Sequence, residues 1–351
     1  MQLSELPKLT QERESIPLFA AGVDIGAASA KIDIDLGEVK IPSAIERLST
    51  PPESILKGRN GGFVSYLDGS RHDLKGTCWY AGDVAIKANP KGHQRVSDDA
   101  SANKIGMSLQ LLLAALTQFS YRPIWNIKLV ASHHDASTLK PQIAAALQGS
   151  HRVLLAQHDH ESVVNITVLS VVHEGMGLVV SQQHRIPENN EVIALDLGGH
   201  STIATVFDGF GQIVDRNPIQ IGVIDLIESI AKNPKMRERC NAQQGDTALI
   251  RAALESAENR FAYGYGRESF NIQDIYEIEL QPWLDSALAK AWKSVEDYKP
   301  RASHYFAIGG GVNLPHVAEC LAAAGLECLP DSEWINARGL YTLAAMHSEE
   351  I

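Results

Sequence analysis

The chain has 351 residues, a formal net charge of −11, 44% hydrophobic residues and four cysteines. This length exceeds one average core and indicates two domains, while the acidic balance argues against a broad direct contact with nucleic acid, which needs a basic face. No two cysteines form a CxxC pair, so we expect reduced, mostly buried thiols in a cytoplasmic protein rather than disulfides or zinc. The polar N-terminus does not resemble a secretory signal, and no apolar run approaches the roughly 18 residues of a transmembrane segment.

Residues 1–18 form a polar tail that contains two prolines, and we expect this tail to be mobile. An apolar strand follows and ends at Asp24. Gly26 and several small residues come next, and an alternating strand then carries Lys31. This order predicts a buried strand that enters a tight turn with exposed backbone N–H groups, where glycine permits the close approach that a phosphate needs.

The chain then alternates between segments with strand and helix patterns. We expect strands at 63–68, 77–81, 126–130 and 164–172, and helices at 101–119 and 138–147. The last of these strands leads directly to Glu174. This alternation is typical of an α/β architecture.

A second strand-to-turn segment repeats the first one at the start of the second half of the chain. Its functional candidates are Asp196, Gly198, Gly199, Ser201 and Thr202. Asp196 lies 196 − 24 = 172 residues after Asp24, about half the chain, which indicates two related units that face one another. An aspartate at such a strand end can hold Mg²⁺ beside a bound phosphate, although the same residues could form an ordinary strand-to-turn corner.

A third apolar strand, 305–308, runs into a further glycine turn at Gly309, Gly310 and Gly311. Helices are expected on both sides of this strand, at 218–231, 246–259, 281–298, 314–324 and 333–347.

Three strand-to-glycine turns in this order resemble the superfamily of actin, sugar kinases and heat-shock chaperone ATPases. Four more segments resemble bacterial actin-like ATPases of the ParM/StbA plasmid-segregation type: 79–85 (WYAGDVA), 146–153 (ALQGSHRV), 171–177 (VVHEGMG) and 336–340 (NARGL). The resemblance implies an actin-like α/β fold with two related domains that flank a nucleotide cleft. It places the domain boundaries at 19–190 for domain I, 191–335 for domain II and 336–351 for a C-terminal helix that returns to domain I.

The resemblance also assigns roles around the phosphates of ATP. Asp24 and Asp196 would hold Mg²⁺, mostly through its waters. Lys31 would face the phosphates, with a solvated strand lysine as the alternative. The remaining phosphate-binding groups would be Gly26, Gly198 and Gly199, helped by the hydroxyls of Ser201 and Thr202. The chain departs from the family at Ala27, where a hydroxyl residue is frequent, so one side-chain donor is lost.

Three more assignments follow from the resemblance. Glu174 would orient the attacking water and accept its proton, because it lies where the family has Gln or Glu; an ordinary hinge glutamate is the alternative. Gly309, Gly310 and Gly311 would let the backbone approach the adenosine. Glu255 and Asn259, both on one expected helix, would contact the purine.

For three other polar clusters the sequence gives weaker evidence of a functional role. The segments 133–135 (HHD) and 158–161 (HDHE) contain metal-ligand residue types without a convincing partner spacing, and we expect solvated loops there. A basic cluster is either a solvated face or a contact with a filament neighbour or an adaptor; its members are Lys232, Lys235, Arg237 and Arg239.

The resemblance therefore implies an ATPase that polymerises head to tail into filaments and moves plasmid DNA through a separate DNA-binding adaptor. A related cytoskeletal role without plasmid cargo fits the same residues. Two other function classes stay open: a small-molecule kinase of the same superfamily, for which no sugar-binding signature is found, and a non-polymerising nucleotide-binding scaffold, which Ala27 favours. Fold alone does not choose among them.

Overall fold

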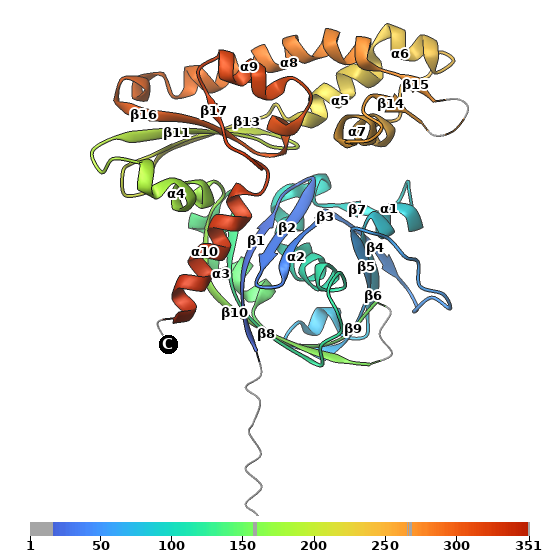
Figure 1. The fold of residues 1–351 in the computed structure, drawn as a ribbon. Coiled ribbons are helices and arrows are strands. Elements are labelled where there is room, and N and C mark those ends of the chain that lie inside the picture. Colours follow the sequence, from blue (N-terminus) through green and yellow to red (C-terminus); the bar gives the residue numbers. More distant parts are fainter. Residues whose placement is uncertain (1–16, 157–159, 265, 267–268, 350–351) are drawn as a thin grey trace, which may run out of the picture.

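The computed structural model describes residues 17–156, 160–264, 266 and 269–349. They form two units, each built around its own sheet, and Figure 1 shows the two units one above the other. We call the unit built on the first sheet the N-terminal unit and the other the C-terminal unit. No helix within the described ranges is long and apolar enough to cross a membrane.

The sheet of the N-terminal unit contains ten strands among the described residues. In their spatial order they are β3 (Gly37–Pro42), β2 (Ser29–Ile34), β1 (Leu18–Ile25), β8 (Ile124–His133), β10 (Ser162–His173), β9 (Gly149–Leu155), β5 (Gly61–Gly69), β6 (Cys78–Gly82), β4 (Ala44–Leu48) and β7 (Gln94–Arg95). The pairs β1–β8 and β8–β10 are parallel, and the other neighbours are antiparallel.

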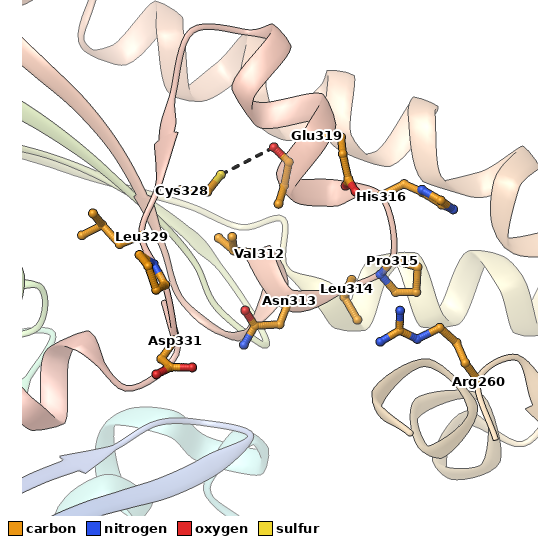
Figure 2. A pocket seen from close by; sticks show the side chains of 12 residues that line it. Arg260, Val312, Asn313, Leu314, Pro315, His316, Glu319, Cys328, Leu329 and Asp331 are labelled. Atoms are coloured by element: carbon orange, nitrogen blue, oxygen red, sulfur yellow. Dashed lines mark hydrogen bonds between the residues drawn. The ribbon is translucent and has the colours of Figure 1, made fainter. Parts of the chain in front are cut away.

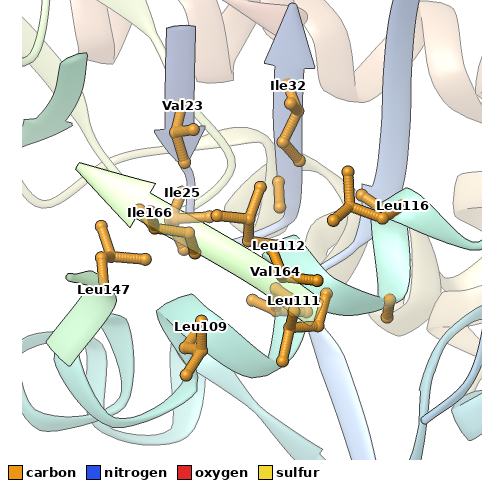
Figure 3. Packing of buried hydrophobic residues seen from close by; sticks show 14 of the residues in the cluster. Val23, Ile25, Ile32, Leu109, Leu111, Leu112, Leu116, Leu147, Val164 and Ile166 are labelled. Carbon is orange, nitrogen blue, oxygen red and sulfur yellow. The ribbon is translucent and has the colours of Figure 1, made fainter. Parts of the chain in front are cut away.

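The helical segments in this part of the chain are α1 (Asp83–Ala88), α2 (Ala100–Leu116), α3 (Ala136–Leu147) and α4 (Met176–Gln182), with short 3₁₀ turns η1 (His72–Leu74), η2 (Val96–Asp99) and η3 (Gln183–Arg185). Of these helices, α4 packs on the sheet of the C-terminal unit. The carboxylate of Asp99 caps α2 by accepting from the Ala102 amide. Helix α2 packs in one core with strands β1, β2 and β10, and Figure 3 shows Leu112, Ile32 and Val164 among the side chains of this core. This packing buries the main core of the unit.

The sheet of the C-terminal unit has the order β13 (Ile213–Ile219), β12 (Thr202–Phe207), β11 (Glu191–Leu197), β16 (Ala302–Ile308) and β17 (Glu327–Cys328). Its other segments are α5 (Val223–Lys232), α6 (Pro234–Arg239), α7 (Thr247–Glu255), the hairpin β14 (Ala262–Tyr263) and β15 (Phe270–Asn271), α8 (Gln273–Ser294), η5 (Glu296–Arg301), η6 (Gly310–Asn313), α9 (Val317–Ala323) and α10 (Ile335–Glu349). Residues from α5, α7, α8 and α9 bury one face of the sheet, and α4 packs on the other.

The two sheets share an arrangement that the repeated turns predict. The order β3-β2-β1-β8-β10 matches β13-β12-β11-β16-β17, with antiparallel neighbours first and parallel neighbours after the central strand. In each unit the first hairpin encloses four residues, 26–29 and 198–201, between its last paired positions. The chain is therefore an internal duplication at the level of structure.

Helix α10 leaves the C-terminal unit and runs along the sheet of the N-terminal unit (Figure 1). Leu340 and Ala344 pack on Ala20 and Val130 of strands β1 and β8. The contact is close because a Cβ at Gly22 would overlap the backbone of α10. The closing helix therefore ties the two units together.

Several expected boundaries are wrong. Strand β13 continues to Ile219, so the helix expected from residue 218 begins only at Val223, where the Asp225 carboxylate caps the Gly222 amide at 2.7 Å. Helix α8 begins at Gln273, eight residues before the expected start. Of the four free cysteines only Cys78 is buried, and the others are partly exposed.

Candidate functional site

The two repeated turns meet at the junction of the units. In the first turn the Gly26 amide donates to the Ser29 carbonyl at 3.0 Å, and in the second the Gly198 amide donates to the Ser201 carbonyl at 2.9 Å. A Cβ added at Gly199 would lie 2.8 Å from the Cβ of Ala28. The two turns, 172 residues apart, therefore have the same internal bond and touch each other.

This geometry changes which groups can bind a phosphate. The amides of Gly26 and Gly198 are already bonded inside their own turns, and the buried Thr202 hydroxyl donates to the Ile221 carbonyl at 2.8 Å. The expectation that these three groups face the phosphates is therefore not met in this conformation. Within the described part of the chain, the amides of residues 27, 28, 199, 200 and 201 in these turns have no hydrogen-bond partner.

Asp24 and Asp196 both lie at the junction, at the ends of β1 and β11. Asp24 is buried and accepts a hydrogen bond of 2.8 Å from the Ser132 hydroxyl. Lys31 is also buried and lies directly opposite Asp24 in the β1–β2 strand register. Burial, together with the charges of Glu174 and Asp24, raises the pKa of Asp196 to about 6, although Lys31 acts in the opposite direction.

A raised carboxyl pKa marks a place where a cation would relieve crowded negative charge. Mg²⁺ prefers hard oxygen ligands, and the carboxylates of Asp24 and Asp196 are ligands of this kind. Among the described residues, no group of three or more His, Cys, Asp or Glu side chains is arranged to hold a metal ion. The donors therefore fit a Mg²⁺ that keeps most of its waters and phosphate ligands, and they do not form a full protein cage.

Glu174 follows β10 and is held by cations from both units. The Lys104 ammonium from α2 pairs with Oε1, and Arg216 Nη2 from β13 lies 3.7 Å from Oε2. Burial of Glu174 opposes ionisation, but Lys104 and Arg216 outweigh it and lower its pKa to about 2. Proton acceptance by Glu174, the general-base role expected from the sequence, is therefore disfavoured near neutral pH. An ionised carboxylate can still orient a water by accepting its hydrogen bonds.

The expectation of a solvated loop at His133–Asp135 is wrong. His133 is buried, its ring lies 4.1 Å from the His134 ring between centroids, and its Nδ1 accepts from the Asp135 amide at 3.1 Å. Burial and the neighbouring His134 lower the pKa of His133 to about 4, so the ring is neutral. Asp135 caps α3. In the second expected loop, His158 and Asp159 lie outside the described residues.

Asn336, the first residue of the NARGL segment, connects three elements. Its Nδ2 donates to the Ser132 hydroxyl at 3.0 Å, and its Oδ1 accepts from the amides of Gly175 and Gly177, both at 3.2 Å. Ser132 in turn donates to Asp24. A continuous buried network therefore links α10, the β10–α4 turn and the carboxylate of Asp24.

The third glycine turn lies against the end of β11. Gly309 has φ +95°, and a Cβ there would overlap the Asp196 carboxylate. A Cβ at Gly311 would lie 2.8 Å from the Leu197 carbonyl, whereas at Gly310 the nearest atom would be Glu333 Oε2 at 4.0 Å. Gly309 and Gly311 are thus needed for packing against β11, whereas a side chain at Gly310 would meet no close neighbour.

A groove of about 430 Å³ lies beside this turn, lined by residues that include Arg260, Asn313, Pro315, His316 and Asp331 (Figure 2). His316 and Asp331 have positive φ angles of 62° and 50°. Non-glycine residues in this conformation are uncommon, and they often occur at functional sites.

The two residues expected to contact a purine do not line this groove. Glu255 is the last residue of α7 and pairs with Arg251 at 3.2 Å. Asn259 lies beyond the helix, contrary to expectation, and lines a separate hollow beside Ser256 and Gly264. The next residue, Arg260, is the one that reaches the groove.

The basic cluster on α5 and α6 is a charged, exposed face with local partners. Lys232 pairs with Glu228 at 2.6 Å, while Lys235 and Arg239 both pair with Asp274. These are exposed ion pairs, which contribute little to stability.

Sequence reasoning missed Lys104, Ser132 and Arg216. Ser132 could have been found from the sequence. It lies near the carboxyl end of β8, directly opposite Asp24 on the parallel strand β1. The carboxyl ends of adjacent parallel strands lie at the same edge of a sheet, where ligands often bind. No comparable sequence pattern marks Lys104 on α2 or Arg216 on β13.

Comparison with known proteins agrees with this geometry. Residues 22–177 match the family model described as the N-terminal domain of actin-like proteins. Bacillus thuringiensis ParM with ATP superposes with a TM-score of 0.69 at 17% identity, covering 95% of this chain and 99% of that one. The archaeal actin homologue Ta0583 gives 0.69 at 18% identity, with 94% and 100% covered. Apo psk41 ParM gives 0.66 at 15% identity, with 95% and 98% covered. No curated protein sequence matches the chain.

These findings confirm two predictions from the sequence. The fold is the actin-like α/β fold, and the resemblance to actin-like proteins of the ParM type holds along nearly the whole chain.

Proposed function

We propose that this actin-like chain is an ATPase that binds ATP with Mg²⁺ between its two units, which would act as domains I (19–190) and II (191–335) with the helix 336–351 closing back on domain I. The main support for this proposal is the contact between the two repeated turns. Asp24 and Asp196 lie near the ends of β1 and β11, the strands that run into these turns. Bacillus thuringiensis ParM, a structural neighbour, has been solved with ATP, AMPPNP and ADP, which supports nucleotide binding by this chain.

Each group in the site has a proposed task. The amides of residues 27, 28, 199 and 200 donate to the phosphates, and Lys31 neutralises their charge. Asp24 and Asp196 would hold Mg²⁺, which would neutralise charge on the phosphates. Glu174 orients the attacking water. Phosphoryl transfer depends mainly on positioning and charge, and these groups would supply both.

We further propose that the chain polymerises head to tail, since a contact that does not close generates a filament. Hydrolysis would loosen the junction of the units and with it the filament. A chain of net charge −11 would reach plasmid DNA through a separate DNA-binding adaptor rather than directly.

The test is sedimentation of the purified chain at micromolar concentration, with and without ATP–Mg²⁺, beside electron microscopy and phosphate release. We expect pelletable filaments and phosphate release with ATP–Mg²⁺ only. The Asp196→Asn variant should lose both together. Phosphate release without assembly would instead favour a non-polymerising ATPase, whereas a kinase would need an acceptor molecule to turn over ATP.

A scaffold without hydrolysis is the second candidate, and Ala27 favours it because the turn lacks a side-chain donor. This candidate predicts nucleotide binding, measured by a fluorescent ATP analogue, with no phosphate release at any protein concentration.

A further inference from the structure

Arg216 lies in the C-terminal unit on the sheet face that looks toward the β10–α4 turn. It pairs with Thr205 across β12 and β13, and Thr205 pairs with Ala194 on β11. Ala194 packs with the α4 side chains. Since directly paired residues share a face, Arg216 projects on the same face as Asp196, two positions beyond Ala194.

From this face Arg216 reaches across to Glu174. Its Nη1 donates to the Glu174 carbonyl at 2.9 Å and to the Thr205 hydroxyl at 3.4 Å, and its Nη2 lies 3.7 Å from Glu174 Oε2. Its side chain is 12% exposed and that of Glu174 11%. A buried arginine is costly unless it is paired, so this contact favours the arrangement in which the two units are close together.

Lys104 holds the other carboxylate oxygen from within the N-terminal unit. The two oxygens of Glu174 therefore face two cations that belong to different units. Lys104 stays beside Glu174 whatever the C-terminal unit does, because α2 and β10 share one core. Arg216 is the contact that depends on closure of one unit on the other.

We propose that Arg216 is a positioning residue that fixes the backbone and carboxylate of Glu174 when the C-terminal unit closes on the N-terminal unit. This inference rests on the proposed ATPase function and adds a mechanism to it. Closure would thereby align the water-orienting carboxylate, so that an open chain with bound nucleotide hydrolyses slowly. A displacement of about 1 Å in such a group can lower a rate by about 10²-fold.

The experiment is a double-variant cycle on the full chain, with phosphate release measured over a range of ATP–Mg²⁺ concentrations. Arg216→Gln should lower kcat by about 10- to 10²-fold and change KM by less than about threefold, because the phosphate-binding turns are untouched. In a Glu174→Gln background the same change should lower kcat by less than about twofold, since residues that act as one unit are not additive.

Arg185→Gln is the matched control. Arg185 pairs with Glu327 through two bonds of 2.8 Å and stacks on Phe306, on the same face of the same sheet, without a contact to Glu174. Its kcat should stay within about twofold of the wild type, as expected for an exposed ion pair. Arg216→Lys retains the buried charge but loses the planar fork, and it should show an intermediate kcat.

Two results would overturn the proposal. One is an unchanged kcat in Arg216→Gln. The other is the same fold loss in both backgrounds, which would mean that Arg216 does not act through the Glu174 carboxylate. If Arg216→Gln does not fold, the cycle is run with Arg216→Lys and decided by the same comparison. A wild-type chain without phosphate release would contradict the proposed function instead, so the two failures are distinguishable.

Discussion

At the scale of single residues, the surroundings of Glu174 decide what it can do. Lys104 and Arg216 hold the pKa of this carboxyl at about 2, so it stays ionised at every pH at which the fold would be studied. It is therefore a poor proton acceptor but a fixed acceptor of hydrogen bonds. In the proposed hydrolysis the proton of the attacking water would therefore go to another acceptor.

Glu174→Gln should therefore slow the chemical step by about 10²-fold, because the amide keeps the shape of the side chain but loses the negative charge and one of the two acceptor oxygens that would orient the water. Nucleotide binding should change little, and filaments should persist longer because their loosening is delayed. Phosphate release and filament lifetime are measured in the same sample. Normal release would show that Glu174 only stabilises the β10–α4 turn.

Asp33 on β2 provides a second test at this scale. Burial, Glu38 and Asp35 raise its pKa to about 6, and Arg338 opposes them only in part. Between about pH 4 and 6 the folded chain binds a proton that the unfolded chain has lost, so stability falls as pH rises through this window. Asp33→Asn removes that dependence. We expect a higher Tm than the wild type at pH 8 and a much smaller difference at pH 4.5.

Asp35→Asn serves as the control for this measurement. The Asp35 carboxylate accepts from the Ala20 amide and from the Tyr341 hydroxyl, both at 2.7 Å. Its loss should lower Tm at pH 8. An equal Tm difference for Asp33→Asn at both pH values would show that the carboxyl is not perturbed.

Part of the site follows from the sequence, and physical reasons explain why the rest does not. Asp24 and Asp196 each end an apolar run before glycines, so local pattern is enough to find them. Arg216 becomes buried only because a turn 42 residues earlier in the chain approaches it in the folded state. Gly26 and Gly198 were assigned to phosphates because sequence does not show that their amides close their own turns.

At the scale of elements, the crossing of α4 and α10 depends on two glycines. A Cβ at Gly339 would overlap the backbone of Gly177, and one at Gly177 would overlap Asn336. The two helices can approach this closely only without side chains at these positions. The crossing also holds the Asn336 network that reaches Asp24.

Gly339→Ala should therefore destabilise the chain by about 1–3 kcal/mol, the range for overpacking. Gly106 is the matched control, because it lies inside α2 and a Cβ there would meet nothing within 4 Å. Gly106→Ala should stabilise by about 0.5–1 kcal/mol through helix propensity. Urea unfolding of both variants checks the opposite signs. Two changes of the same sign would mean that packing at the crossing does not decide the outcome.

Element types were more predictable than element limits. Helix α2 lies close to its expected range because apolar residues recur at helical spacing along it, and residues 107–116 are all buried. Helix α8 was expected to begin at Gln281, next to Pro282, whereas this proline lies in its interior. Helix α7 was expected to extend to Asn259, but it ends at Glu255 because the backbone at Ser256 is extended.

At the scale of the whole molecule, the repeated turns predict two related units, and the matching strand orders show that duplication. The contact of Gly199 with Ala28 was not predictable, because it depends on how one unit sits on the other. It also means that phosphates can enter between the turns only if these separate. Nucleotide binding should therefore change the relation between the units.

Net charge gives a prediction for assembly. The chain carries 31 basic and 42 acidic residues, so each subunit that joins a filament approaches a neighbour of like net charge. The range of this repulsion falls from about 30 Å at 0.01 M salt to about 10 Å at 0.1 M. We therefore expect the critical concentration for ATP-dependent assembly to fall as KCl is raised across this interval at constant ATP–Mg²⁺. Pelleting at each salt concentration measures it, with the affinity for a fluorescent ATP analogue determined in parallel so that weaker nucleotide binding is not mistaken for weaker assembly. A critical concentration that rises steadily with salt, at constant nucleotide affinity, would show that complementary ion pairs across the subunit contact outweigh the net repulsion.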